Sequence, residues 1–408
     1  MRPIREFSGR LSVALTLAVF ACDVCAEAQA RGDSKAVAEG NTAFALDLYG
    51  KLAQNKGNLC VAPHSISTAL AMTYAGARGD TEKQMAKVLH FSLDQNRLHP
   101  GFAALEAPLR ALQATGDVEL RVANALWPQK GHPFRSEFLD VTKRYYGAAI
   151  ECVDFVKARE AARKKINTWA KQETKDRIPE LIPPGLFTDW TRLVLTNAIY
   201  FKGNWQSQFE AKRTTMAPFR IAAGKSAKVP MMVQDRKFRY MEEDNVQVLE
   251  LPYVGNALSM IVLLPKRVGG LGDLEASLST QNLSKWLGRL RETTVQTQLP
   301  KFKLSSKLKL ADTLVSMGMS DAFDMKKADF SGMDGRRWLY ISAVVHETFV
   351  TVNEEGSEAA GATAVVMKLR SRPPARAVFH ANHPFVFVIR HNPSGSLLFV
   401  GRVVDPRG

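Results

Sequence analysis

Apolar positions recur along this chain with two different periods, one early in the sequence and another from about residue 193 onward. In the early part, Val37, Phe44, Leu48 and Leu52 keep to one face at helical spacing, and residues 159–174 form a basic amphipathic segment. Side chains three and four residues apart share one face of a helix. The pattern therefore predicts amphipathic helices in both places.

Two further helix starts are predicted from capping residues. Ser65 stands just before the apolar positions Ile66 and Leu70 and is expected to cap that helix. In "TEKQMAKVL", Thr81 and Gln84 have the spacing of a capping box, in which each side chain bonds the backbone N–H of the other residue. These signals predict helices that begin at Ser65 and Thr81.

From about residue 193 the pattern is that of β-strands. The stretches "LVLTNAIYF" and "LSMIVLLP" are continuous apolar runs, as in strands covered on both faces. Lysines alternate with apolar residues in "KFKLSSKLKL", which predicts a half-buried strand, and "PFVFVIRHNPSGSLLFVGRVV" predicts a hairpin. Helices early and strands late, without regular βαβ alternation or a long linker, indicate one α+β domain with large, mostly antiparallel sheets.

The N-terminus has the three-part layout of a secretory signal. Arginines come first, then an apolar run from Leu11 to Ala21, then small residues ending in "AQA". The run is too short to span a bilayer, so we expect residues 1–30 to be a signal peptide and residues 31–408 to be the mature domain. The protein would be secreted to the extracellular space, or to the periplasm in a bacterium. Lipoprotein anchoring at Cys22 is the less favoured alternative.

Composition indicates a large folded core. The 408 residues are 46% hydrophobic and 23% charged, with a formal net charge of +15, which excludes a wholly disordered chain. Once residues 1–30 are removed, Cys60 and Cys152 are the cysteines that remain, and both stand in strand-like apolar stretches. We therefore expect two buried free thiols rather than a disulfide framework.

The sequence lacks the common local signatures of catalytic and metal sites. No G-x-S-x-G, H-E-x-x-H, C-x-x-C or P-loop pattern is present, so we expect no enzyme, no cofactor and no metal. His380 and His383 are three residues apart in an extended stretch, which points them to opposite faces. The basic region Lys157 to Arg177 has no nucleic-acid motif and is interpreted as a solvated helix face, with binding of a polyanion such as heparin as the alternative.

Many side chains of the segment from Asn353 to Ala375 are too small to anchor a hydrophobic core. It reads "NEEGSEAAGATAVVMKLRSRPPA", in which small residues follow two acids and a pair of prolines comes near the end. As a strand from Gly356 to Met367, it would have one face free of charge, and no proline would interrupt its pairing before Pro373. The segment could therefore join a sheet without being held there, although a flexible Ala/Gly-rich linker would have the same composition.

The sequence resembles the serpin family at this point, and in particular its inhibitory members. The stretch "EEGSEAAGATA" closely matches the reactive-loop hinge of that family, and "FHANHPFVFVI" matches its C-terminal signature. The stretches "SISTALAMTYAGARGDTEKQMAKVLHF", "LVLTNAIYFKGNWQSQF", "LELPY", "ADFSGM" and "VVHETFVTVNEEG" match in the same order. The resemblance covers about residues 37 to 406, essentially the whole mature chain.

This resemblance implies a single domain of three β-sheets and about nine helices, with an exposed reactive-centre loop at about residues 354–376. The family's loop register, counted over fifteen residues from the hinge glycine, places the scissile bond between Arg370 and Ser371. The small residues that open the loop form its hinge: Gly356, Ser357, Glu358, Ala359, Ala360, Gly361, Ala362 and Thr363.

The resemblance also implies a suicide-substrate inhibitor and not an enzyme. A trypsin-like protease accepts Arg370 in an acidic pocket and is acylated, and the cleaved hinge then inserts into the central sheet and carries the protease along. We expect a monomer that forms a covalent complex with its protease. A non-inhibitory carrier or chaperone is the alternative, although such members usually have proline or bulky residues in the hinge.

Two groups of polar residues are assigned to this movement by the resemblance, and both act through hydrogen bonds rather than catalysis. Ser65, Asn197 and His346 match the cluster where the central sheet parts. Trp205, Lys301 and Glu354 match the region where the loop first enters. Ala62 stands where many family members have serine.

Overall fold

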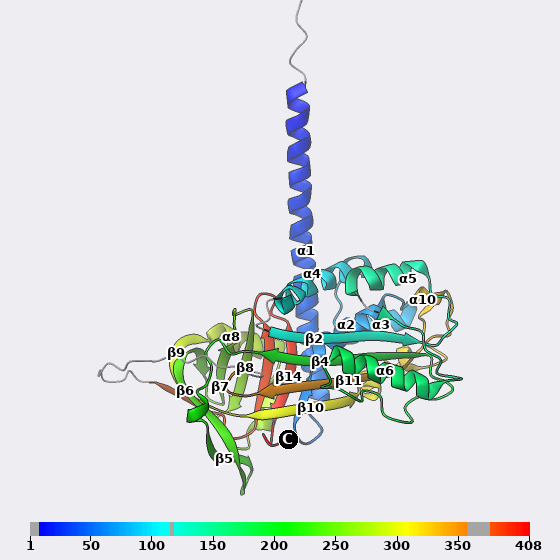
Figure 1. Ribbon diagram of the computed structural model, residues 1–408. Helices are drawn as coiled ribbons and strands as arrows, with labels where there is room; N and C mark the ends of the chain where they lie inside the picture. Colours follow the sequence, from blue (N-terminus) through cyan, green and yellow to red (C-terminus); the bar gives the residue numbers. More distant parts are fainter. Residues whose placement is uncertain (1–7, 115–117, 148, 357–375) are drawn as a thin grey trace, which may run out of the picture.

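The computed structural model describes the backbone of residues 8–114, 118–147, 149–356 and 376–408, with side chains from residue 28 onward except at positions 113, 114 and 149 (Figure 1). The first half contains α1 (Ser8–Leu52), β1 (Leu59–Val61), α2 (Pro63–Tyr74), α3 (Gly79–Val88), α4 (Gln95–Ala114), β2 (Val118–Pro128), α5 (Ser136–Val141), η1 (Thr142–Tyr146), β3 (Ala149–Ile150), α6 (Arg159–Glu173) and β4 (Leu193–Gly203).

The second half is richer in strands. It contains η2 (Ala211–Arg213), β5 (Thr215–Ala222), β6 (Lys225–Glu242), β7 (Val246–Pro252), β8 (Leu258–Pro265), α7 (Leu271–Ser277), α8 (Thr280–Arg289), β9 (Arg291–Pro300), β10 (Phe302–Lys309), α9 (Ala311–Ser316), η3 (Asp321–Phe323), α10 (Ser331–Asp334), β11 (Ile341–Val352), β12 (Ala377–His380), β13 (Phe385–His391) and β14 (Leu397–Val403).

A five-stranded sheet with the order β10-β11-β4-β2-β3 runs across the molecule (Figure 1). The apolar run of β4 is covered on both faces, as predicted, because its side chains alternate between two cores. Val194 and Ala198 pack with residues of α6, whereas Leu193 and Leu195 belong to the core formed with α1 and α2. This sheet therefore lies between helices, with no face left for solvent along β4.

The other strands form a nine-stranded sheet with the order β1-β14-β13-β8-β7-β6-β9-β12, and β5 pairs with β6. The 18-residue strand β6 pairs with β9 along much of its length and with β7 at its end, so it joins two smaller sheets into one. The three sheets of the resemblance correspond to the five-stranded sheet and the two halves of this one. The predicted hairpin is β13 and β14.

The predicted helices form, but both predicted N-terminal caps, Ser65 and Thr81, are wrong. The helix α2 begins at Pro63, and α3 begins at Gly79, each without a side-chain cap at its N-terminus. Thr81 is buried and its hydroxyl accepts the N–H of Asp329 at 3.0 Å. Ser65 lies within α2 and bonds to β2 instead. Both hydroxyls therefore bond residues that are distant in the sequence and do not cap their own helices.

The two cysteines differ in exposure. Cys60 in β1 is buried, as predicted, and burial raises the pKa of its thiol to about 12. Cys152 is exposed, so its predicted burial is wrong. The strand β3 ends at Ile150 and is the last in its sheet, so the apolar pattern around Cys152 does not continue as a covered strand. Within the described part of the chain, no helix has the length and apolar character needed to cross a membrane.

Candidate functional site

The centre of the five-stranded sheet is a ladder between two parallel strands, which we term the seam. β4 and β11 pair from Leu193 with Ile341 to Phe201 with Val350. Both strands run toward the same end of the sheet, where β11 ends at Val352 (Figure 1). A further strand placed between β4 and β11 would have to separate this ladder.

Four polar side chains, which we term the central polar cluster, lie across the middle of the seam: Ser65, Asn124, Asn197 and His346. Asn124 is half-buried, and the other three are buried. Asn197 and His346 are partners in the β4–β11 ladder, and the imidazole Nδ1 of His346 bonds Asn197 Oδ1. The amide nitrogen of Asn197 donates to the Ser65 hydroxyl and to Asn124 Oδ1. The structure thus brings together the three residues predicted for the opening of the sheet.

Asn124 was missed in the sequence. It lies on β2 and is the ladder partner of Asn197, and its Oδ1 accepts the Ser65 hydroxyl at 3.2 Å. The signal that could have found it is an amide within the apolar run "VANALW", because a polar side chain that such a strand withdraws from water requires hydrogen-bond partners.

Ala62 contributes to the central polar cluster through its backbone. Its N–H donates to Nε2 of His346 at 3.1 Å. Because Nε2 accepts this bond, the ring proton is on Nδ1, which donates to Asn197. Burial lowers the pKa of His346 to about 3, so the ring is neutral near neutral pH. Protonation would place two N–H groups against each other at Ala62.

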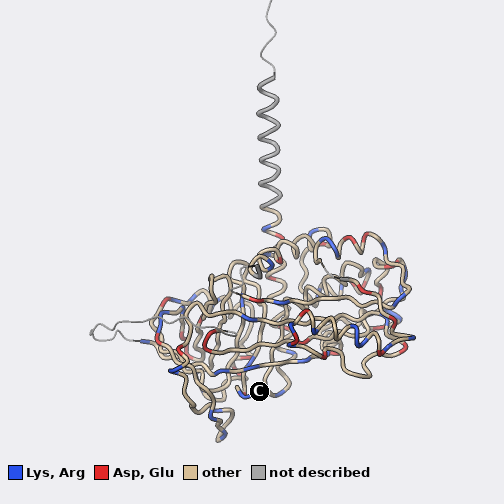
Figure 2. The backbone as a smooth tube through the Cα atoms, viewed as in Figure 1, with Lys and Arg blue, Asp and Glu red and all other residues tan. Residues whose placement is uncertain are grey.

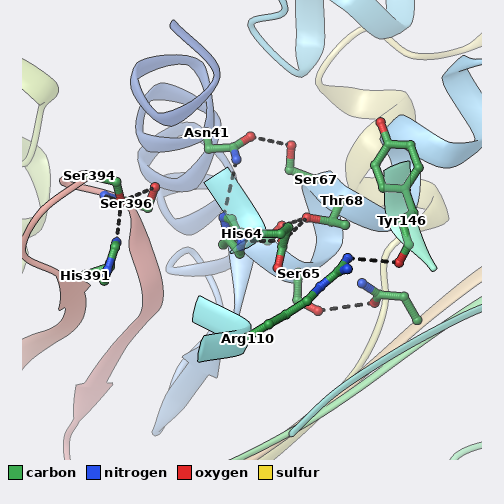
Figure 3. A network of polar contacts seen from close by, with 12 residues as sticks. Asn41, His64, Ser65, Ser67, Thr68, Arg110, Tyr146, His391, Ser394 and Ser396 are labelled. Carbon is green, nitrogen blue, oxygen red and sulfur yellow. Dashed lines mark hydrogen bonds and ion pairs between the residues drawn. The ribbon is translucent and has the colours of Figure 1, made fainter. Parts of the chain in front are cut away.

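The helix α2, which carries Ser65, is held on its other side by a second polar network (Figure 3). Asn41 of α1 accepts the Ser67 hydroxyl at 2.6 Å and bonds His64 at 3.4 Å. His64 also pairs with Glu106 of α4 at 2.7 Å. Burial by itself raises the pKa of Glu106, but its partner His64 outweighs this effect and the pKa is lowered. The network keeps Ser65 directed at the sheet.

Trp205, Lys301 and Glu354 lie together where β11 ends, and we term them the strand-end cluster. The indole N–H of Trp205 donates to the carbonyl of Asn353 at 3.0 Å. Glu354 pairs with Lys301 at 2.8 Å and accepts the Thr214 hydroxyl at 2.8 Å. Burial raises the pKa of Glu354, but these two partners lower it further than burial raises it. The chain leaving β11 is therefore attached to its neighbours.

Gly356 closes this end of the seam in a position that only glycine fits. Its φ is +126°, and it forms an antiparallel bridge with Asn204. A Cβ added here would lie 2.1 Å from the carbonyl oxygen of Gly203 and 2.6 Å from the backbone nitrogen of Trp205. The first residue of the predicted hinge thus lies directly on the chain that continues β4.

Several predicted residues lie outside the described residues, and so does the side chain of Cys22. They are Ser357, Glu358, Ala359, Ala360, Gly361, Ala362, Thr363, Arg370 and Ser371. Among the described residues, no group of three or more His, Cys, Asp or Glu is placed to hold a metal ion.

Comparison with known proteins agrees with this geometry. The profile of the family described as Serpin (serine protease inhibitor) matches residues 39–406. Leukocyte elastase inhibitor of Homo sapiens is 43% identical over 380 residues, which cover 91% of this chain and 99% of the relative. The protein of the same name from Xenopus tropicalis is 43% identical over 374 residues, covering 90% and 98%.

Solved structures show the same fold. That of a tumour suppressing serpin matches with a TM-score of 0.83 and 29% identity, over 91% of this chain and 100% of the other. Uncleaved ovalbumin matches with a TM-score of 0.81 and 30% identity, over 91% and 100%. The α+β fold expected from the sequence is confirmed, and the chain belongs to the serpin family of serine protease inhibitors.

Proposed function

We propose that this serpin is an exported suicide-substrate inhibitor of trypsin-like serine proteases and is cleaved between Arg370 and Ser371. The observation that carries the proposal is the closed seam with Gly356 at its end. A strand entering from Gly356 runs antiparallel to both β4 and β11. Such a strand can bond both neighbours, so the backbone groups that β4 and β11 now direct at each other would again be paired after insertion.

The first step is an ordinary acyl transfer. The catalytic serine of the protease attacks the carbonyl carbon of Arg370, and the bond to the nitrogen of Ser371 breaks. The protease histidine gives that nitrogen a proton, and Arg370 remains attached to the protease as an ester. Water completes hydrolysis unless the hinge inserts first, which moves the protease about 45 Å for about 14 residues at ~3.3 Å each.

The central polar cluster and the strand-end cluster control how readily the seam opens. Insertion must break the bond between Asn197 on β4 and His346 on β11, because the new strand lies between them. It must also displace the chain held by the pair of Lys301 and Glu354. Small hinge residues lower the barrier to insertion, because bulky or charged side chains in their place would be forced into a packed sheet.

The target class is assigned from Arg370. A guanidinium fits a deep pocket with an acid at its base, as in trypsin, whereas the pocket of an elastase is small. The relatives are named leukocyte elastase inhibitors. Because the loop of this chain also contains Val366 and Met367, cleavage at an apolar residue is the outcome that would reassign the target.

Incubation with trypsin and with elastase, in parallel, tests the proposal. We expect a trypsin complex that survives SDS and a new amino terminus at Ser371 by mass spectrometry. The Arg370→Ala variant should lose the trypsin complex, and Ser357→Arg should be cleaved without forming one, since an arginine in the hinge hinders insertion. Clean cleavage of the wild type without a complex would instead favour a non-inhibitory serpin.

Export is proposed from the N-terminal signal. Residues 28–32 are exposed, whereas Asp33 and Val37 are buried against the domain. Removal of residues 1–30 therefore spares the part of α1 that packs. Expression of the full chain in a secreting host should yield a product that begins near Arg31, and a retained residue 1 would contradict this proposal.

Polyanion binding is not proposed as a second function. Basic side chains of the region 157–177 pair with acids: Arg163 with Glu160 and Glu180, and Lys165 with Glu151. Further pairs are Arg159–Asp189, Lys171–Asp176 and Lys175–Glu119. Figure 2 shows acidic and basic positions mixed over the body. These acids offset the charge that the basic segment would present.

A further inference from the structure

Two tryptophans are exposed at the end of the seam opposite Gly356. Trp190 is 62% and Trp338 is 63% exposed, the largest values among the large hydrophobic side chains in the described part of the chain. Each stands three residues before the first paired residue of its strand, Leu193 in β4 and Ile341 in β11, and these two residues are ladder partners. The tryptophans therefore stand at equivalent positions on the two sides of the seam.

The backbone of Trp190 and the ring of Trp338 each contact a neighbouring residue. The Tyr340 hydroxyl donates to the carbonyl of Trp190 at 2.5 Å, which ties the two strand entrances together. The guanidinium of Arg336 lies 4.9 Å from the centre of the Trp338 ring. Tryptophan and arginine are among the residues that most often anchor protein interfaces.

The register of Gly356 relates this surface to the reactive bond. In an antiparallel pair, each step forward along one strand is a step back along the other. Gly356 is the antiparallel partner of Asn204. Fourteen residues beyond Gly356 is Arg370, and fourteen residues before Asn204 is Trp190. If the inserted strand continues this register, Arg370 arrives level with Trp190 on one side and Trp338 on the other.

We propose that Trp190 and Trp338 form the docking surface for the trapped protease, an inference that rests on the proposed function. The protease is esterified to Arg370, so the rim of its active site meets whatever surrounds that residue after insertion. Two exposed indoles are placed there, and their burial would favour the docked arrangement. Contacts at this surface hold the distorted protease and slow its release by water.

Oxidative footprinting of the tryptophan side chains tests the contact. The free serpin, the chain cleaved without a bound protease, and the trypsin complex are each exposed to hydroxyl radicals and digested for mass spectrometry. We expect oxidation of Trp190 and Trp338 to fall at least about fivefold in the complex alone. The internal control is Met216 on β5, which is 61% exposed and should react equally in all three.

Each failure has its own signature. A complex in which both tryptophans oxidise as in the free serpin overturns this inference and leaves the proposed function intact. Protection already present in the cleaved chain also overturns it, because insertion alone would then cover the indoles. If no covalent complex forms with trypsin, the proposed function and this inference fail together.

Variants test the holding role. The double variant Trp190→Ala/Trp338→Ala should associate with trypsin at the wild-type rate, because acylation precedes docking, but its complex should regain protease activity at least about fivefold faster. Trp190→Phe/Trp338→Phe keeps the aromatic surface and should restore the lifetime, and Met216→Ala should not change it. Equal lifetimes for the double alanine variant and the wild type would contradict the proposal.

Discussion

At the scale of single residues, Asn197 connects the two strands of the seam to α2 and β2. Its carbonyl accepts from His346 and its amide nitrogen donates to Ser65 and Asn124. Asn197, His346 and Ser65 are buried, so each bond that one of them loses leaves a polar group without water to replace its partner. One amide therefore supports four elements of the fold.

Asn197→Ala should lower the free energy of unfolding by about 2–3 kcal/mol, because His346, Ser65 and Asn124 would each lose a hydrogen-bond partner. Denaturant unfolding followed by fluorescence measures the change. The matched control is Asn96→Ala on the exposed face of α4, which should stay within about 0.5 kcal/mol of the wild type. Equal losses for the two variants would show that the cluster bonds add no stability.

His346 gives the stability a predictable pH dependence. Its pKa is about 3 in the folded chain and ordinarily 6.5, so between these values the unfolded chain binds a proton that the folded chain does not. The free energy of unfolding should therefore fall as the pH drops from about 6.5 toward 3. Buried His99 and His391, with pKa values of about 4, act in the same direction.

His346→Gln separates these contributions. Glutamine can accept from Ala62 and donate to Asn197 but does not titrate, so the unfolding free energy of this variant should change less steeply with pH in that window. Unfolding measured at half-unit pH steps checks the slope. A slope as steep as that of the wild type would assign the pH dependence to other groups.

At the scale of elements, the seam is closed at one end by Gly356 and opened to solvent at the other beside Trp190 and Trp338. Apolar runs predicted β4, β8 and the C-terminal hairpin because burial on both faces leaves a continuous signal. Helix starts were less well predicted. Ser65 and Thr81 have capping chemistry, but distant partners compete for their hydroxyls.

Gly356→Ala should destabilise the chain more than a glycine substitution that introduces backbone strain alone. The added Cβ would meet the backbone of Gly203 at 2.1 Å, so the segment must move off the end of β4. We expect a loss of about 3 kcal/mol against about 1 kcal/mol for Gly255→Ala, where φ is +79° and the space is open. Thermal unfolding of both variants gives the comparison, and equal losses would contradict it.

At the scale of the whole molecule, the described strands form a five-stranded sheet whose two central neighbours are parallel and a nine-stranded sheet that packs behind it. Phe201, Val350 and Val352 of the first sheet share a core with Phe387 and Phe399 of the second. A sixth strand inserted at the seam would pair antiparallel with β4 on one side and with β11 on the other.

Cleavage in the loop should raise the thermal stability of the molecule. An inserted strand replaces one ladder by two and adds backbone hydrogen bonds, each with a net contribution of about 1 kcal/mol. We expect the unfolding temperature of the cleaved, protease-free chain to rise by at least about 10 °C, at about 2–4 °C per kcal/mol. Calorimetry before and after cleavage measures it, and Ser357→Arg, cleaved in the same way, should rise less.

Patterns of consecutive residues were enough to predict the α+β class and the strands buried on both faces, because burial and periodicity are local properties of the chain. The hinge at Gly356 comes from the resemblance to the serpins and stays a prediction. The likeness of its long motifs to the serpins named the polar residues of the seam. The folded chain was needed to show that Asn124 bonds Asn197, that the backbone of Ala62 bonds His346, and that Cys152 is exposed. Contacts between distant segments depend on strand order and register, which no local pattern specifies.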